Sequence, residues 1–449
     1  MLILKFISLS LLNLIAGQVL TKRLYLIFSF LLLWVVANPS ELAADDLIDS
    51  STFTDSQKSS SGSAFDSLSF LQERVIAQFT TRYIQDSNVF LRNYDTEASV
   101  LNGSVLLGVK GGGLPDEPGL SYRLLYGGNY FASMSDDFEY ESPADHSFFS
   151  GFELRGAFTT LKLDANIEEL GGYSRSEPFA DGISSTFGEA NQLGYQRKSV
   201  ALGISRELTS SELALRLSMN RTEYNASNLI SRSYENEKFA ADLSWFYDPV
   251  FLAKTRLGIG LNFGQEEISQ SASGSQNFVA PSVRFRWNYS PKTAFSGRIG
   301  FDERWRDTDD FSETTPVYGL KGMWTAPTDT QFSIDITKQV YSSIYEIDNN
   351  VATEKFSIGA RQPFEGGIEI ELRYFYEFSG YQSTLNAGSL RSRTEDLQSL
   401  RFSLGKSLNL GFFDDAQVSI FYNQLVNEST KDYYDFERNQ YGLQLKISL

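Results

Sequence analysis

From about Glu73 to the end of the chain, apolar and polar side chains alternate in bursts of roughly ten residues. In the burst 284–289, three aromatic side chains fall on one side of an extended chain, whereas Arg284, Arg286 and Asn288 fall on the other. A period of two predicts β-strands. Strands of soluble proteins average about five or six residues, but a tilted strand needs about 9 to 11 residues to cross a membrane. The length of the bursts therefore predicts a transmembrane β-barrel.

The alternation yields about eighteen strand candidates, and an even number returns the chain to the side of the membrane on which it started. The predicted fold class is therefore all-β, a closed antiparallel up-and-down barrel formed by residues 74–449. The candidate strands are 74–85, 99–111, 120–132, 147–158, 159–169, 195–207, 211–223, 236–247, 252–265, 276–290, 293–304, 315–324, 330–341, 353–361, 366–378, 398–407, 416–428 and 439–449.

The connections between these strands are alternately short and long, as a barrel with short inner turns and longer outer loops requires. Tight turns rich in Pro, Asp, Ser and Thr are predicted in the periplasm at 209–210, 248–250, 291–292, 325–329 and 362–365. Longer loops are predicted to face away from the cell at 133–146, 171–194, 224–235, 266–275, 305–314, 342–352, 379–397 and 429–438.

The N-terminal region differs from the rest of the chain. Lys22 and Arg23 precede an apolar run that ends at Ala37, so residues 1–37 are predicted to be a signal peptide, with cleavage near Ala44 as the alternative. A further apolar stretch lies at residues 1–20. Either the signal peptide is unusually long, or translation starts downstream of Met1. An uncleaved helical anchor is the other interpretation.

Residues 38–73 are predicted to form a periplasmic linker. The stretch 45–63 is rich in Ser and Asp and has too little apolar surface to pack, which predicts disorder. The segment 64–73 is interpreted as a short helix or a plug-like entry to the barrel. Beyond this point no run approaches the roughly 18 apolar residues of a transmembrane helix, which excludes a helical membrane protein.

Composition excludes several function classes. The formal charge of -17 argues against a nucleic-acid partner, since phosphate binding needs clustered Lys and Arg. The chain has no cysteine, which suits a bacterial envelope and excludes disulfides, Cys-ligated zinc and thiol nucleophiles. No cofactor and no metal are predicted. Asp307, Asp309 and Asp310 are interpreted as hydrated loop charge, with a Ca²⁺ site as the alternative.

The face opposite the apolar one is predicted to line an aqueous lumen. Basic residues on that face outnumber acidic ones, which predicts a net basic pore that prefers anions, including acidic oligosaccharides. The alternative is that these charges pair across strands and fill the lumen. The predicted lumen-lining residues are Arg123, Arg155, Lys162, Arg216, Lys254, Arg256, Arg284, Arg286, Arg298, Lys321, Arg361, Arg373 and Arg401. The same face includes Arg82, Lys110, Glu153, Asp164, Asp242, Asp302, Asp335, Glu369 and Glu371.

Glycines and aromatic residues add two predictions. Gly258, Gly260 and Gly264 lie on the predicted inner face and are expected to leave space in the lumen. Aromatic residues near strand ends are expected to form interfacial girdles, although β propensity also enriches them in strands. These residues are Tyr83, Tyr130, Phe158, Tyr247, Tyr289, Trp324, Tyr341 and Phe378.

Enzymatic functions find little support, and no catalytic residue is predicted. The single histidine, His146, is flanked by an Asp and a Ser, but consecutive residues of a strand point to opposite faces and cannot form a triad. Glu369 and Glu371 share one face, as a pair of glycosidase acids would. The nearby Arg373 favours a salt bridge in the lumen instead.

Residues 440–449 alternate strictly and end the chain. They resemble the C-terminal signal by which the barrel assembly machinery recognises outer-membrane proteins, although Leu449 stands where Phe is usual. Pairing of this strand with the first leaves no sheet edge exposed to lipid. The assembly machinery and outer-membrane lipid are therefore predicted partners.

The segment from Tyr83 to Leu91 reads Tyr-Ile-Gln-Asp-Ser-Asn-Val-Phe-Leu. It is similar to the Tyr-Asp-(Ser/Asp)-Asn-aliphatic-Phe signature near the start of porins of the "beta-barrel porin 2" type, with Ile84 and Gln85 inserted. The rest of the chain, with patterns such as 287–293, also resembles this family. The resemblance implies an outer-membrane barrel with a transport role and no catalytic residues. Some members of the family accompany exopolysaccharide loci.

These observations predict a diffusion pore or export conduit in the outer membrane of a Gram-negative-type bacterium. The alternative is a surface structural or adhesion barrel that binds a partner through its long outer loops while its lumen is closed. Closure is expected from an inward-folded loop, 171–194 or 379–397, or from the segment 64–73. A membrane-embedded hydrolase that depends on His146 is the third hypothesis, because a fold does not fix a function.

Overall fold

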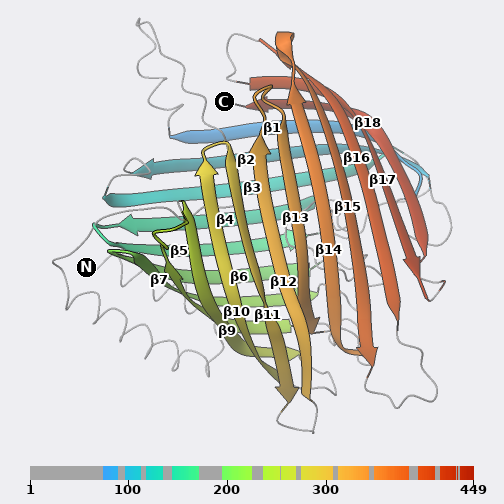
Figure 1. Ribbon diagram of the computed structural model, residues 1–449. Coiled ribbons are helices and arrows are strands. Elements are labelled where there is room, and N and C mark those ends of the chain that lie inside the picture. The colour runs from blue at the N-terminus through green and yellow to red at the C-terminus, as the bar shows by residue number, and fades with distance from the viewer. Residues whose placement is uncertain are drawn as a thin grey trace, which may run out of the picture.

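Within the residues that it describes, the computed structural model forms one closed sheet of eighteen strands (Figure 1). Each strand pairs antiparallel with the next one in sequence, and β18 pairs with β1. The predicted fold class is confirmed. The strands are β1 (Val75–Asp86), β2 (Ala98–Gly112), β3 (Gly119–Ser133), β4 (Ala144–Arg155), β5 (Thr159–Leu170), β6 (Tyr195–Leu208), β7 (Ser211–Tyr224), β8 (Asn236–Tyr247), β9 (Thr255–Ile268), β10 (Ser275–Ser290), β11 (Thr293–Arg306), β12 (Ser312–Thr325), β13 (Gln331–Ser342), β14 (Asp348–Pro363), β15 (Ile368–Ser383), β16 (Thr394–Leu408), β17 (Asp415–Ser429) and β18 (Phe436–Ser448).

The structure describes residues 74–88, 97–112, 118–134, 144–170, 195–224, 236–252, 254–268, 275–306, 312–342, 348–383, 393–409, 415–430, 432 and 435–448. Several predictions lie outside these residues. They concern the signal peptide and linker at 1–73, the loops proposed to close the lumen and the three loop aspartates at 307–310. Among the described residues, no helix is both long enough and apolar enough to cross a membrane.

The connections divide between two ends of the barrel, as predicted. One end, called the short-turn rim, carries the connections 113–118, 156–158, 209–210, 248–254, 291–292, 326–330, 364–367 and 409–414. The other end, called the long-loop rim, carries 87–97, 134–143, 171–194, 225–235, 269–274, 307–311, 343–347, 384–393 and 430–435. Figure 1 shows the strands of one wall, β1 to β6, crossing those of the opposite wall, β13 to β17, at a steep angle. Tilted strands in a closed barrel produce this crossing.

One strand is displaced from its predicted position. The burst assigned to 147–158 forms β4 at Ala144–Arg155. The prediction left no residues for a turn before β5. In the structure, residues 156–158 make that turn, and the N–H of Gly156 donates to the carbonyl of Thr159 at 2.9 Å. The need to reverse the chain therefore moves the whole strand toward the long-loop rim.

The outer face of the barrel is apolar and exposed. Ile259, Val283 and Ile299 are 58%, 59% and 66% exposed, and their strand neighbours on the other face are glycines, arginines and one serine. A soluble protein rarely leaves such a large apolar surface uncovered, because its contact with water is unfavourable. This surface requires an apolar environment.

Aromatic side chains form a belt on the outer face at the short-turn rim, from β8 to β13. Ring centroids lie 6.3 Å apart for Trp245–Tyr247, 5.7 Å for Trp287–Phe295 and 5.3 Å for Trp324–Phe332. Tyr341 was predicted to join a girdle, but it lies on the inner face. Its hydroxyl donates to Gln339, two residues away on the same face, at 2.8 Å.

Candidate functional site

The candidate functional site is the inner face of the barrel. Along β10, Val283 and Tyr289 are exposed on the outer face, so the alternation turns Arg284 and Arg286 inward. The same parity places twelve of the predicted residues on inner-face positions of eleven strands. These are Arg123 on β3, Arg155 on β4, Lys162 on β5, Arg216 on β7, Arg256 on β9, Arg284 and Arg286 on β10, Arg298 on β11, Lys321 on β12, Arg361 on β14, Arg373 on β15 and Arg401 on β16.

Lys254 is placed differently from its prediction. It precedes β9, in the connection from β8, and has a positive φ of 62°. Its ammonium group donates to the carbonyl of Tyr289 at 2.5 Å and lies 5.1 Å from the centre of that ring. Since the Tyr289 ring is on the outer face, Lys254 belongs to the short-turn rim and does not line the lumen. The predicted strand started too early for the turn to fit.

Two acidic and two basic side chains form a network on the inner face near the short-turn rim. Glu207 pairs with Glu212 across β6 and β7, and Arg256 pairs with Arg286 across β9 and β10. Like charges that face each other across two strands repel. Here the two glutamates reach the two arginines across the intervening strand β8. Arg256 donates to Glu207 at 2.9 Å and to Glu212 at 2.7 Å, while Arg286 donates to Glu212 at 3.0 Å. Each like-charged pair is therefore compensated by the other.

Sequence reasoning missed both carboxylates of this network. They flank the tight turn at 209–210, where each has inner-face parity on a predicted strand. Their position on the inner-face side of the alternation could have identified both residues from the sequence. The contact across β8 had no sequence signal, because strands three apart in the sheet meet only where the wall curves. The guanidinium of Arg286 also lies over the ring of Phe246, 3.9 Å from its centre.

Arg284 and Asp242 form a bidentate pair, with N–O distances of 2.8 and 2.6 Å. The guanidinium crosses β9 at Gly260. A Cβ atom added there would lie 2.1 Å from Nε of Arg284. At Gly258, an added Cβ would lie 2.6 Å from the ring of Phe246. Gly258 and Gly260 thus leave space on the inner face, but side chains of neighbouring strands fill it, so the two glycines do not open the lumen as predicted.

Farther around the barrel, β12 to β15 carry ion pairs that water reaches. Lys321 lies 3.1 Å from Asp335, and their side chains are 63% and 41% exposed. Arg361 lies 2.6 Å from Glu369, and Arg373 pairs with Glu371. Both carboxylates considered as glycosidase acids are therefore engaged by arginines, as the salt-bridge interpretation predicted.

The inner face near the long-loop rim is packed. Arg304, which is 2% exposed, donates to Asp302 at 2.9 Å, to the carbonyl of Val340 at 2.6 Å and to Ser342 at 3.2 Å. Arg438 pairs with Asp86, and neither side chain is more than 1% exposed. Apolar side chains are buried inside this rim in two clusters, Ile84 with Ala98, Val100 and Phe131, and Phe375 with Leu397, Leu425 and Phe436.

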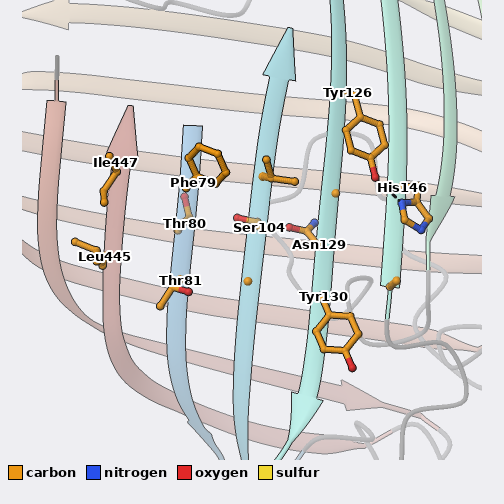
Figure 2. Close-up of a pocket in the computed structure, with 14 residues that line it drawn as sticks. Phe79, Thr80, Thr81, Ser104, Tyr126, Asn129, Tyr130, His146, Leu445 and Ile447 are labelled. Atoms are coloured by element: carbon orange, nitrogen blue, oxygen red, sulfur yellow. Dashed lines mark hydrogen bonds between the residues drawn. The ribbon is translucent and has the colours of Figure 1, made fainter. Parts of the chain in front are cut away.

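His146 lies on the outer face, where its Nδ1 is 2.9 Å from the hydroxyl of Tyr126. Alternation turns the neighbouring Asp and Ser inward, so no triad forms. Figure 2 shows His146, Tyr126, Tyr130 and Phe79 on the outside of β1 to β4, around a shallow groove of 540 Å³. The described residues include no group of three or more His, Asp or Glu side chains that could hold a metal ion.

No protein-family model matches this sequence, and no curated protein matches it. The resemblance to "beta-barrel porin 2" proteins therefore stays a prediction. OpdK of Pseudomonas aeruginosa, solved with vanillate, is similar with 12% identity over 84% of this chain and 99% of that chain, at a TM-score of 0.45. OccAB4 of Acinetobacter baumannii has 10% identity over 84% and 97%, at a TM-score of 0.43. The siderophore receptor PirA of P. aeruginosa has 11% identity over 84% and 80%, at a TM-score of 0.40. At these TM-scores the likeness carries no argument about function.

Proposed function

We propose that this chain is an outer-membrane pore through which small solutes diffuse, with a preference for anions. One observation carries the proposal. Inside a closed barrel with an apolar outer face, charged inner-face side chains stay in contact with water, as the 63% and 50% exposure of Lys321 and Arg373 indicates. A barrel of about eighteen strands is wide enough for an aqueous lumen. Lipid is the environment that suits its outer face.

The proposed orientation follows from the two rims. Short turns face the periplasm in outer-membrane barrels and longer loops face outward. The aromatic belt at the short-turn rim then lies at the inner interface of the outer membrane, where Trp and Tyr are favoured. The closure of β18 on β1 fits assembly by the barrel machinery through the C-terminal strand. The proposal includes no covalent catalysis and no nucleic-acid partner.

The anion preference rests on the distribution of inner-face charge. Lys110 stands directly opposite Arg123 in the register, and Arg298 stands opposite Arg284, whose own charge is already balanced by Asp242. Among the described residues, Arg216 and Arg298 form no ion pair. Such an arrangement lowers the barrier for a negative solute more than for a positive one. Acidic oligosaccharides are the largest solutes that we include in the proposal.

Single-channel recordings of the purified full chain in planar bilayers test this function. In a KCl gradient, the reversal potential is expected to have the sign of an anion-selective pore. A reversal potential of the opposite sign would overturn the anion preference. No conductance at all would overturn the pore itself. Permeation of oligogalacturonates of increasing length into liposomes then measures the largest acidic solute that passes.

A closed barrel that binds a partner through its outer loops is the second candidate. The packed interior of the long-loop rim favours it, because two apolar clusters and the buried Arg304 and Arg438 reduce the open cross-section there. The two candidates differ in conductance. A closed barrel gives no steps in planar bilayers and no swelling of liposomes in neutral sugars.

A further inference from the structure

We propose a binding subsite for one carboxylate group of a passing solute on the inner wall formed by β5, β6 and β7. This inference rests on the proposed pore function and adds the place where an anion is held. A hollow of 210 Å³ opens from the lumen into this wall. Its charged lining residues are Lys162, Asp164, Arg216, Asp242, Arg284 and Arg286.

The hollow exists because a glycine separates two cations. Gly203 on β6 stands directly between Lys162 on β5 and Arg216 on β7 in the register of the sheet. A Cβ atom added to Gly203 would meet a single neighbour, the Cβ of Lys162 at 3.7 Å. The space above Gly203 is therefore free. This differs from Gly260, whose space is filled by the guanidinium of Arg284.

The carboxylates nearest to these two cations are already paired, and neither pairs with Arg216. Asp242 stands opposite Arg216 in the register, but both of its oxygens accept from Arg284. Glu153 lies 2.9 Å from the ammonium group of Lys162 and also pairs with Arg155. Within the described part of the chain, Arg216 has no ion pair. Its guanidinium is thus the cation of this wall whose charge the protein leaves uncompensated.

The remaining charges of the hollow keep its balance positive. Arg286 is engaged by Glu212 at 3.0 Å, and Asp164 extends over Gly151 on β4, with Oδ1 3.2 Å from the position of an added Cβ. Asp164 and Asp242 are the two acids that line the hollow, against four basic side chains. An arriving carboxylate therefore meets a guanidinium fork with an ammonium group beyond it.

The size of the hollow sets the class of ligand. A volume of 210 Å³ admits one anionic group with a few attached atoms, not a whole oligosaccharide. The ligand is therefore a small organic acid, or one acidic sugar unit of a longer chain. Both present the same carboxylate to Arg216, and a monomer and an oligomer of the same acid separate the two sources.

D-galacturonate is a suitable probe, with D-galactose as its uncharged counterpart. In planar bilayers, galacturonate is expected to block the chloride current of the wild-type pore, and galactose is not. Arg216→Gln, which removes the guanidinium, and Gly203→Leu, which fills the hollow while keeping every charge, are each expected to raise the half-blocking concentration about tenfold. A trimer of galacturonate distinguishes an oligomer from a free acid by its lower half-blocking concentration.

Two variants serve as matched controls. Lys292→Gln removes one positive charge from an exposed turn at the short-turn rim, and Gly103→Leu places the same side chain on the outer face, where an added Cβ meets nothing within 4 Å. Both are expected to leave the half-blocking concentration unchanged. Gel electrophoresis shows whether each variant is folded, because an unheated folded barrel migrates differently from the same protein after heating.

The outcomes separate this inference from the proposed function. If the wild type shows no anion-selective current, the proposed function fails. If the wild type is anion-selective and blocked, but folded R216Q and G203L proteins are blocked as easily as the controls, only the subsite is overturned. A tenfold change in R216Q alone, with G203L unchanged, also overturns it, because the hollow is then not where the acid sits.

Discussion

Ion pairs occur at both ends of the inner face, but in opposite environments. Near the short-turn rim, Lys321 and Asp335 are 63% and 41% exposed, whereas at the long-loop rim Arg438 and Asp86 are 1% and 0% exposed. An exposed pair contributes about 0–1 kcal/mol to stability and remains available to ions in the lumen. A buried pair becomes costly to break, because the surviving charge loses water and partner together. In the proposed pore, access to water decides whether an inner-face charge can act on passing ions or only holds the wall together.

The largest expected effect is at the seam where the barrel closes. Asp86→Ala removes the carboxylate that Arg438 and the amide of Gln440 both contact. It leaves a buried guanidinium between β1 and β18. We expect a loss of roughly 3–5 kcal/mol in the free energy of unfolding. Urea unfolding in detergent micelles, followed by tryptophan fluorescence, measures this loss.

Asp335→Ala is the matched control at the exposed end of the comparison. It removes the partner of Lys321 and is expected to cost about 0–1 kcal/mol, since water solvates the remaining ammonium group. Equal losses in the two variants would show that the described difference in exposure has no energetic consequence.

An intermediate effect is expected for Gly260→Ala. The added methyl group occupies the position of the Arg284 guanidinium, so Arg284 must leave Asp242. We expect a loss of roughly 1–3 kcal/mol in unfolding free energy from overpacking. The released Asp242 carboxylate then faces Arg216 across the sheet, which is expected to weaken the anion preference. The reversal potential in a KCl gradient measures the second effect, and a more strongly anion-selective variant would contradict it.

The smallest effect on stability is expected for Lys321→Gln. Its ammonium group is exposed, so the unfolding free energy is expected to change by about 0.5 kcal/mol or less. The permeability ratio of anion to cation is expected to fall by about twofold or less, because one charge in a wide, screened lumen contributes little by itself. A large shift in the urea midpoint, with an unchanged permeability ratio, would contradict this prediction. It would mean that Lys321 stabilises the wall and does not act on ions in the lumen.

Local patterns predicted most of the fold. The alternation at 284–289 placed Arg284 and Arg286 on one face because successive side chains of a strand point in opposite directions whatever the tertiary structure. The turn at 209–210 needed only its own residues to be recognised. The errors are found where two local requirements compete for the same residues. Residues 156–158 alternate like a strand but are needed to reverse the chain, and Lys254 was included in a strand for the same reason.

The partners of the charges were beyond the reach of the sequence. Parity shows that Arg256 and Glu212 share a face, but not that they lie 2.7 Å apart over β8. It also does not show that Arg304 is buried while Lys321 is exposed, since the two positions alternate in the same way on neighbouring strands. Tyr341 was misplaced because an aromatic residue near a strand end fits either face.

The sequence by itself determined that the chain forms strands, how many there are and which side of each is polar, because these properties depend on a backbone period of two residues. Only the tertiary structure decided which charges neutralise each other and which stay in water. Closing the sheet brings β1 beside β18 and curves the wall so that strands two and three apart touch. Burial and pairing follow from that curvature, which no local pattern of residues encodes.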